Sequence, residues 1–193
     1  MFHPFAQATL LCAALLSLSA CVPLPARAPE TVATRAIAPV FELYGRLSAS
    51  DGKQAASGQL EWRHAHATDS FTLLTPLGQI VAQLDADALG ARLHTADGQV
   101  VTAESTAILL PRVLGIDVPA VRLSHWVQAA PDTSAEVRQR DTRGRPTLVI
   151  DQGWRIEYLD YRSTDADAPP TRLDISRGDA HIRLIIDSWT SQP

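Results

Sequence analysis

Most of the chain consists of short stretches of alternating apolar and polar residues, separated by sequences typical of turns. In residues 41–49, Phe41, Leu43 and Leu47 fall on one face, whereas Glu42 and Arg46 fall on the other. A period of two residues is typical of a β-strand with one buried face. Asp-Gly pairs at 51–52 and 97–98 add the signature of tight hairpins. The pattern therefore predicts a protein built mainly of β-strands.

The alternating stretches number about eleven and follow one another through short connections. They are residues 41–49, 57–63, 70–75, 79–86, 91–95, 99–102, 136–141, 147–152, 154–162, 171–177 and 181–189. Sequential strands joined by short turns favour an antiparallel meander. A sheet of so many strands tends to curl or close, and a barrel wider than its side chains can fill encloses a cavity.

The period changes between residues 103 and 128, where two amphipathic helical segments are expected. In 103–115, Ile108, Leu109, Val113 and Leu114 fall on one helical face, and Gly115 can end the helix. Pro111 should kink this segment or split it into two turns, because proline cannot donate a helical hydrogen bond. In 118–128, Leu123, Trp126 and Val127 form the apolar face. We expect these two segments to cover the apolar face of the sheet as a lid.

The first residues indicate export. Residues 7–20 carry no charge and are mostly apolar, but the run is shorter than the roughly 20 residues that span a bilayer. It fits the hydrophobic region of a signal peptide. Leu-Ser-Ala-Cys at 18–21 resembles the lipobox of bacterial lipoproteins, which implies lipid attachment at Cys21, and Val22 in place of aspartate favours the outer membrane.

The alternative for Cys21 is a buried or disulfide-bonded cysteine after ordinary cleavage. However, the other cysteine of the chain, Cys12, lies in the segment predicted to be removed. We therefore predict a signal peptide over residues 1–20, a lipidated N-terminus and a tether rich in Pro and Ala over 21–39, and a folded domain over 40–193.

Composition and motifs argue against several functional classes. The net charge is −4 and no run of Lys and Arg stands out, so nucleic-acid binding is not expected. The sequence has no Gly-x-Ser-x-Gly, His-Glu-x-x-His or phosphate-binding loop. His64 and His66 could form half of a metal site, but a solvated loop is the favoured interpretation. His125, on the second helical segment, is expected to have a capping or surface role. The prediction is a protein without enzymatic activity, cofactor or metal.

Several short sequences, taken in order, point to one family. They are GRL at 45–47, SGQLEW at 57–62, TPLGQ at 75–79, VPAVRLSHW at 118–126, GW at 153–154 and IRLIIDSW at 182–189. With the lipobox, they resemble the LolB family of outer-membrane lipoprotein receptors from about Phe41 onward. The segment before Phe41 lacks the longer helix expected from that family, and Pro111 could alter lid mobility.

The resemblance implies a fold and a function. The fold would be an unclosed antiparallel β-barrel with a helical lid over a hydrophobic cavity, similar to the periplasmic carrier LolA. The function would be to accept acylated lipoproteins from a LolA-like carrier and insert them into the inner leaflet of the outer membrane. The protein would be anchored in that membrane by lipid, would face the periplasm, and is expected to be a monomer.

Apolar residues on the inward strand faces and on the helices are the candidates for an acyl-chain cavity, and the alternative is that they only fill a core. They are Leu43, Leu47, Leu60, Trp62, Phe71, Leu73, Leu84, Leu93, Leu109, Val113, Leu123, Trp126, Trp154, Ile156, Leu173 and Leu184. Acyl chains require only apolar area, so the sequence alone cannot separate a cavity from a core.

Pro76, Leu77 and Gly78 form a turn with an apolar residue at its tip, where polar residues are usual. Leu77 could fold back onto the barrel rim. The family resemblance implies instead an exposed leucine that helps to deliver cargo to the membrane. A second functional hypothesis is a lipid-sensing or signalling module on the same half-barrel, and a third is an outer-membrane scaffold with a filled core.

Overall fold

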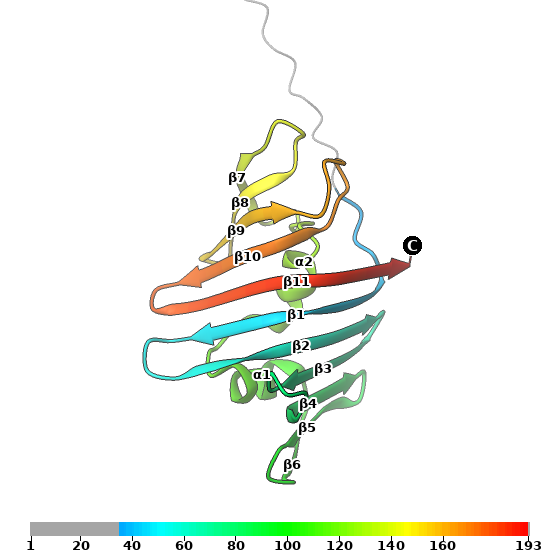
Figure 1. Ribbon diagram of the computed structural model, residues 1–193, viewed down its shortest axis with the longest axis vertical. Coiled ribbons are helices and arrows are strands. Elements are labelled where there is room, and N and C mark those ends of the chain that lie inside the picture. Colours follow the sequence, from blue (N-terminus) through cyan, green and yellow to red (C-terminus); the bar gives the residue numbers. More distant parts are fainter. Residues whose placement is uncertain (1–34, 193) are drawn as a thin grey trace, which may run out of the picture. The chain divides into compact units, whose positions relative to one another are not determined.

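The computed structural model describes residues 35–192, which form eleven strands and two helices. Figure 1 shows the strands as a broad sheet with both helices on one of its faces. The strands are β1 (Val40–Ser50), β2 (Ala55–Ala65), β3 (Thr68–Leu74), β4 (Ile80–Asp87), β5 (Gly90–Thr95), β6 (Val100–Ala103), β7 (Glu136–Arg140), β8 (Pro146–Asp151), β9 (Trp154–Tyr161), β10 (Pro170–Arg177) and β11 (Ala180–Gln192). The helices are α1 (Thr106–Leu114) and α2 (Ala120–Trp126).

All eleven strands belong to one antiparallel sheet in the order β6-β5-β4-β3-β2-β1-β11-β10-β9-β8-β7. The first and last strands pair in the middle of the sheet, with Leu47 opposite Leu184. Within the described residues β6 and β7 are edge strands that do not pair with each other. The predicted unclosed, mainly β architecture with about eleven strands is therefore confirmed.

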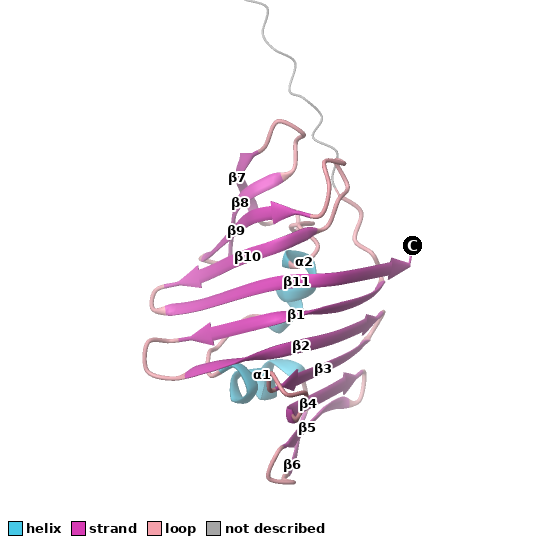
Figure 2. Ribbon diagram, viewed as in Figure 1, coloured by secondary structure: helices cyan, strands magenta, loops and turns pink. Residues whose placement is uncertain are grey.

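The alternating pattern determines which face is buried. In β1, Phe41, Leu43 and Leu47 are buried, and the polar residues between them are exposed. The same alternation continues in β9 and β11, and the inward side chains form one apolar cluster with residues of the helices. Figure 2 shows that α1 and α2 lie against a single face of the sheet. The apolar face is thus covered by the two segments expected to form a lid.

Gly45 allows the two central strands to approach closely. A Cβ atom at this position would lie 2.2 Å from the carbonyl oxygen of Ile185 on β11. The β1–β11 register also shifts between Tyr44 and Gly45, which marks a β-bulge. Bulges bend the strand and increase its local twist. Glycine is required here because any side chain would collide with the backbone of the neighbouring strand.

The structure corrects two expectations for the helices. The segment was predicted to kink at Pro111 or to split there into two turns; it does not split, but forms one helix, α1, that runs through Pro111 to Leu114 and is followed by Gly115 at a left-handed φ of 72°. Its buried face consists of Leu109, Leu110 and Leu114, whereas Ile108, which was expected on that face, is exposed. The apolar face predicted for the second segment is confirmed, because Leu123, Trp126 and Val127 are all buried.

The prediction of a solvated loop holds for His66, which is exposed in the turn after β2, but was wrong for His64. Strand β2 extends to Ala65, and the His64 side chain is only 15% exposed. The His64 Nδ1 atom lies 2.8 Å from Oδ1 of Asp69, and the ring stacks on Phe41 at 5.0 Å. The histidine is therefore part of the folded sheet.

Candidate functional site: an apolar cavity and an exposed loop

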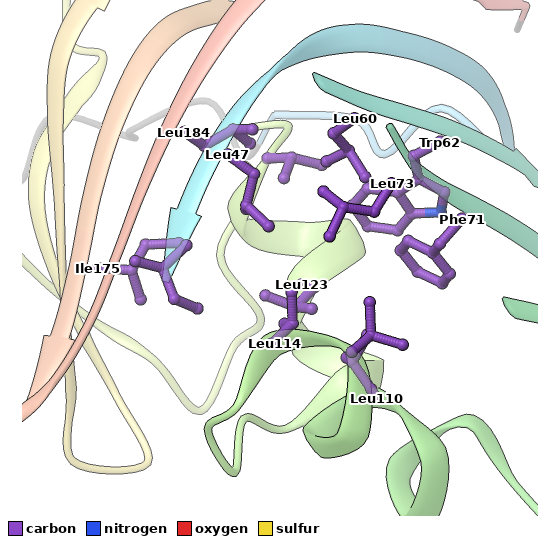
Figure 3. A pocket seen from close by; sticks show the side chains of 13 residues that line it. Leu47, Leu60, Trp62, Phe71, Leu73, Leu110, Leu114, Leu123, Ile175 and Leu184 are labelled. Atoms are coloured by element: carbon purple, nitrogen blue, oxygen red, sulfur yellow. The ribbon is translucent and has the colours of Figure 1, made fainter. Parts of the chain in front are cut away.

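A small cavity of about 40 Å³ lies between the sheet and both helices. Figure 3 shows side chains from several strands and from both helices converging on it. The lining residues are all apolar: Leu47, Leu60, Trp62, Phe71, Leu73, Leu110, Val113, Leu114, Leu123, Val127, Ile175, Ile182 and Leu184. A space with such walls can bind hydrocarbon, because no polar group has to lose its hydration.

The sheet wall of the cavity is built from cross-strand pairs. Leu60 on β2 is paired with Leu73 on β3, and one step along the same face Trp62 is paired with Phe71. The Trp62 and Phe71 rings stack with their centroids 4.6 Å apart. Side chains opposite each other on one face of an antiparallel sheet are held in contact by the strand register. Leu47 of β1, Ile175 of β10, and Ile182 and Leu184 of β11 complete the sheet wall, which is thus set by the alternating sequences of five strands.

The polar edge of Trp62 is satisfied outside the cavity. Its indole Nε1–H donates a hydrogen bond to Oδ1 of Asp69 at 2.8 Å, and the same oxygen lies beside His64. A buried indole N–H without a partner would cost free energy. The interaction with Asp69 therefore lets the large indole ring line the cavity without presenting a polar atom to it.

The helical wall comes from both helices. Leu110, Val113 and Leu114 of α1 are three and four residues apart, a spacing that places side chains on one face of a helix. Leu123 lies on α2 and Val127 immediately follows it. All five side chains line the cavity, and Figure 3 shows Leu110, Leu114 and Leu123 pointing into it from the side opposite the sheet.

Beyond the cavity, the core contains further buried aromatic residues. The Trp126 ring of α2 lies 5.9 Å from the Trp154 ring of β9, and both side chains are fully buried. Burial raises the pKa of the neighbouring Tyr158 well above its ordinary value, so this side chain stays neutral. These aromatic side chains belong to the buried apolar cluster and do not line the cavity.

The structure divides the predicted cavity residues into two equal groups. Those that line the cavity are Leu47, Leu60, Trp62, Phe71, Leu73, Val113, Leu123 and Leu184. Those that lie elsewhere in the buried cluster are Leu43, Leu84, Leu93, Leu109, Trp126, Trp154, Ile156 and Leu173. The prediction did not include five lining residues, which are Leu110, Leu114, Val127, Ile175 and Ile182. The alternation of apolar residues in β10 and β11 could have indicated Ile175 and Ile182, and the helical spacing could have indicated the other three.

The loop between β3 and β4 presents a leucine to solvent. Within the loop, Gly78 N–H donates to the Thr75 carbonyl at 2.9 Å, and Thr75 N–H donates to the Gln79 carbonyl at 2.8 Å. Gly78 has a φ of +81°, which favours glycine, and Pro76 precedes Leu77 in the turn. The Leu77 side chain is 90% exposed, so it does not fold back onto the sheet.

Several predictions concern the N-terminus. The predicted signal peptide, Cys21 and most of the tether lie outside the described residues. The described part, residues 35–39, contacts the domain: the Arg35 guanidinium donates to the carbonyl oxygens of Ala166, Asp167 and Ala168. The predicted tether is therefore bound to the domain over its last residues.

Two other kinds of feature are missing from residues 35–192. Neither helix in residues 35–192 has the length and hydrophobicity to cross a lipid bilayer. In the same part of the chain no three His, Cys, Asp or Glu side chains are grouped so that they could hold a metal ion. His125 contacts backbone instead, with Nδ1 3.3 Å from the carbonyl oxygen of Ala130, four residues beyond α2.

Comparison with known proteins identifies the family. The family described as outer membrane lipoprotein LolB matches residues 39–189. Outer-membrane lipoprotein LolB of Azoarcus sp. (strain BH72) is 54% identical over 182 residues, which cover 94% of each chain. Its counterpart in Thiobacillus denitrificans is 36% identical and covers 86% of this chain and 88% of its own length. A crystal structure of a LolA superfamily protein from Nitrosomonas europaea has a TM-score of 0.48 at 8% identity, covering 84% of this chain and 90% of that one. From the sequence matches, the chain belongs to the LolB family of outer-membrane lipoproteins.

Proposed function

We propose that this LolB-family protein, which receives lipoproteins from LolA for insertion into the outer membrane, binds their acyl chains in the cavity between its sheet and its two helices. The observation that carries the proposal is the composition of the cavity wall, in which all lining side chains are apolar. Each methylene group moved from water into such a site contributes about 0.8 kcal/mol. Transfer from the carrier then needs only an affinity difference between two apolar sites.

The cavity must enlarge to hold an acyl chain. Its volume of about 40 Å³ is close to the share of one or two water molecules in the liquid, roughly 30 Å³ each. An acyl chain of a lipoprotein occupies far more space than this. Apolar side chains of the helices therefore have to separate from the sheet when cargo enters, and the cargo replaces the contacts that they lose.

We also propose that Leu77 contacts the bilayer when cargo is delivered. Its side chain is exposed at the tip of a loop whose residues 75–79 carry no charge. Burying a leucine side chain in an apolar environment contributes about 1.5–3 kcal/mol. This contribution would lower the free energy of the state in which the loop touches the membrane and the cargo leaves.

Reconstitution tests both proposals. Purified lipidated protein is mixed with carrier-bound lipoprotein and phospholipid vesicles, and cargo is followed from carrier to receptor to vesicle. We expect Leu77→Glu to accept cargo normally but to insert it at least tenfold more slowly, because the charged side chain opposes contact with the membrane. Leu89→Glu is the matched control, since Leu89 is 95% exposed in the turn between β4 and β5 and should retain normal insertion.

The outcomes separate the two proposals. If cargo never leaves the carrier for the wild-type protein, the cavity is not an acyl-chain site. Equal insertion rates for Leu77→Glu and the wild type would remove the special role of Leu77. Equal losses in both variants would indicate a general effect of charge on the surface.

A further inference from the structure

Helix α2 is fastened to the sheet through a buried carboxylate. The Trp126 indole N–H of α2 donates a hydrogen bond of 2.8 Å to Oδ2 of Asp151 at the end of β8. Asp151 is only 1% exposed, and Nε of Arg122, also on α2, lies 3.9 Å from the same oxygen. This helix is therefore bound to the β8–β9 hairpin by a charge-assisted contact inside the protein.

A second polar contact holds the end of α2. Gln128 is 6% exposed, and its Oε1 accepts a hydrogen bond of 2.8 Å from the backbone N–H of Ala38, just before β1. Its Nε2 donates to the carbonyl oxygen of Ser124 within α2 at 3.0 Å. The side chain thus joins the last turn of the helix to the residues that lead into β1.

Helix α1 is held differently. Between described residues, no side chain of α1 makes a hydrogen bond or an ion pair, and the side chain of Ser105 does not cap the helix. Its attachment consists of the buried Leu109, Leu110 and Leu114, while Ile108 is exposed. Apolar contacts of this kind are non-directional, so an acyl chain can replace them.

The two modes of attachment respond differently to a ligand in the cavity. Moving α2 away from the sheet would separate Trp126 from Asp151 and leave a buried carboxylate without its partner, which hydrocarbon cannot replace. Moving α1 exposes only apolar side chains, which the ligand itself can cover. We propose that α2 is a fixed wall of the cavity, held by Asp151 and Gln128 as positioning residues, and that α1 is the wall that moves. This inference rests on the proposed function of the cavity.

Hydrogen exchange measured by mass spectrometry tests the inference on the full chain. Exchange is recorded with and without a synthetic triacylated lipopeptide, whose binding is followed independently by fluorescence. We expect peptides covering 106–114 to change their exchange rates at least fivefold on binding, whereas peptides covering 120–126 change less than twofold. Equal changes in both helices on lipopeptide binding would contradict this inference but not the proposed function. Absence of lipopeptide binding would contradict the proposed function and, with it, this inference.

Variants at Asp151 test its positioning role. Asp151→Ala should raise exchange in 120–126 at least fivefold without lipopeptide and make that helix respond to the ligand. Asp151→Asn keeps an oxygen acceptor for Trp126 and should restore most of the protection, a rescue that general loss of packing would not give. If Asp151→Ala does not fold, Trp126→Phe removes the same hydrogen bond from the other side. Exchange in 120–126 that stays at the wild-type level in Asp151→Ala or Trp126→Phe would overturn the role of Asp151.

Discussion

Adding one methylene group to Val127 should stabilise the protein and weaken its binding of acyl chains. Val127 is 2% exposed and lines the cavity at the end of α2. Voids in protein cores cost about 24 cal/mol per Å³, so a volume of about 40 Å³ corresponds to roughly 1 kcal/mol. One additional buried methylene group contributes about 0.8 kcal/mol. Val127→Ile is therefore expected to increase the free energy of unfolding by up to about 0.8 kcal/mol.

The same methylene group should oppose the ligand. An acyl chain that enters the cavity must displace the added group, which loses about the same 0.8 kcal/mol and reduces affinity about fourfold. Unfolding in urea measures the stability, and titration with a fluorescent triacylated lipopeptide measures the affinity. Stability and ligand binding are thus expected to change in opposite directions, as is common for sites that need empty space.

Val121→Ile provides the matched control. Val121 lies on the same helix but is 79% exposed, so the same chemical change adds no buried contact. Both its stability and its affinity should stay within about 0.5 kcal/mol of the wild type. The reasoning is refuted if Val127→Ile is less stable than the wild type, or if it is more stable and yet binds the lipopeptide with unchanged affinity.

Two further predictions concern stability. Hydrogen bonds from the backbone and hydroxyl of Ser134, together with the charge of Arg122, lower the pKa of Asp132 to about 2. Because this folded-state pKa lies below the ordinary 3.8, the carboxylate stabilises the protein above about pH 4, and this contribution is lost as the pH falls towards 2. Asp132→Asn should accordingly be less stable than the wild type in urea unfolding at pH 6 but nearly equal to it close to pH 2; a difference that does not depend on pH would contradict the assignment. Gly45→Ala should lower the free energy of unfolding by at least about 2 kcal/mol, because its Cβ would lie 2.2 Å from the Ile185 carbonyl oxygen. Thermal unfolding measures the loss. An unfolding temperature equal to that of the wild type would show that β1 and β11 can move apart at no cost in stability.

The strands could be predicted well from the sequence, because the alternation of apolar and polar side chains is a local property of each strand. Alternation depends only on which residues of a strand face the interior, and the inward positions of Leu43 and Leu60 followed from it directly. The helix face was harder to predict, because residues 107–110 are all apolar and the angle at which α1 docks on the sheet decides which of them are buried. The docking angle buried Leu110 and left Ile108 exposed.

The kind of residue that lines the cavity could be predicted, but not which individual residues line it. Leu73 and Leu84 both face inward from neighbouring strands, yet only Leu73 lines the empty space. The difference depends on where the helices lie over the sheet, which involves residues distant in the sequence. The hydrogen bond that holds α2 could not be predicted either, because Asp151 and Trp126 are 25 residues apart and come into contact only in the folded state. The exposure of Leu77 was expected only from the family resemblance, because the turn alone also allowed its side chain to fold back onto the barrel rim.

The pairing of β1 with β11 has a consequence for the order of events during export. A chain that crosses a membrane from its N-terminus delivers β1 early, but the strand that completes the centre of the sheet is the last one to emerge. Until then one side of β1 is an unpaired edge of eleven residues, and open strand edges favour association with other chains. Strands as far apart in the sequence as β1 and β11 also pair slowly. The centre of the sheet therefore cannot form until the thirteen residues of β11 have been delivered.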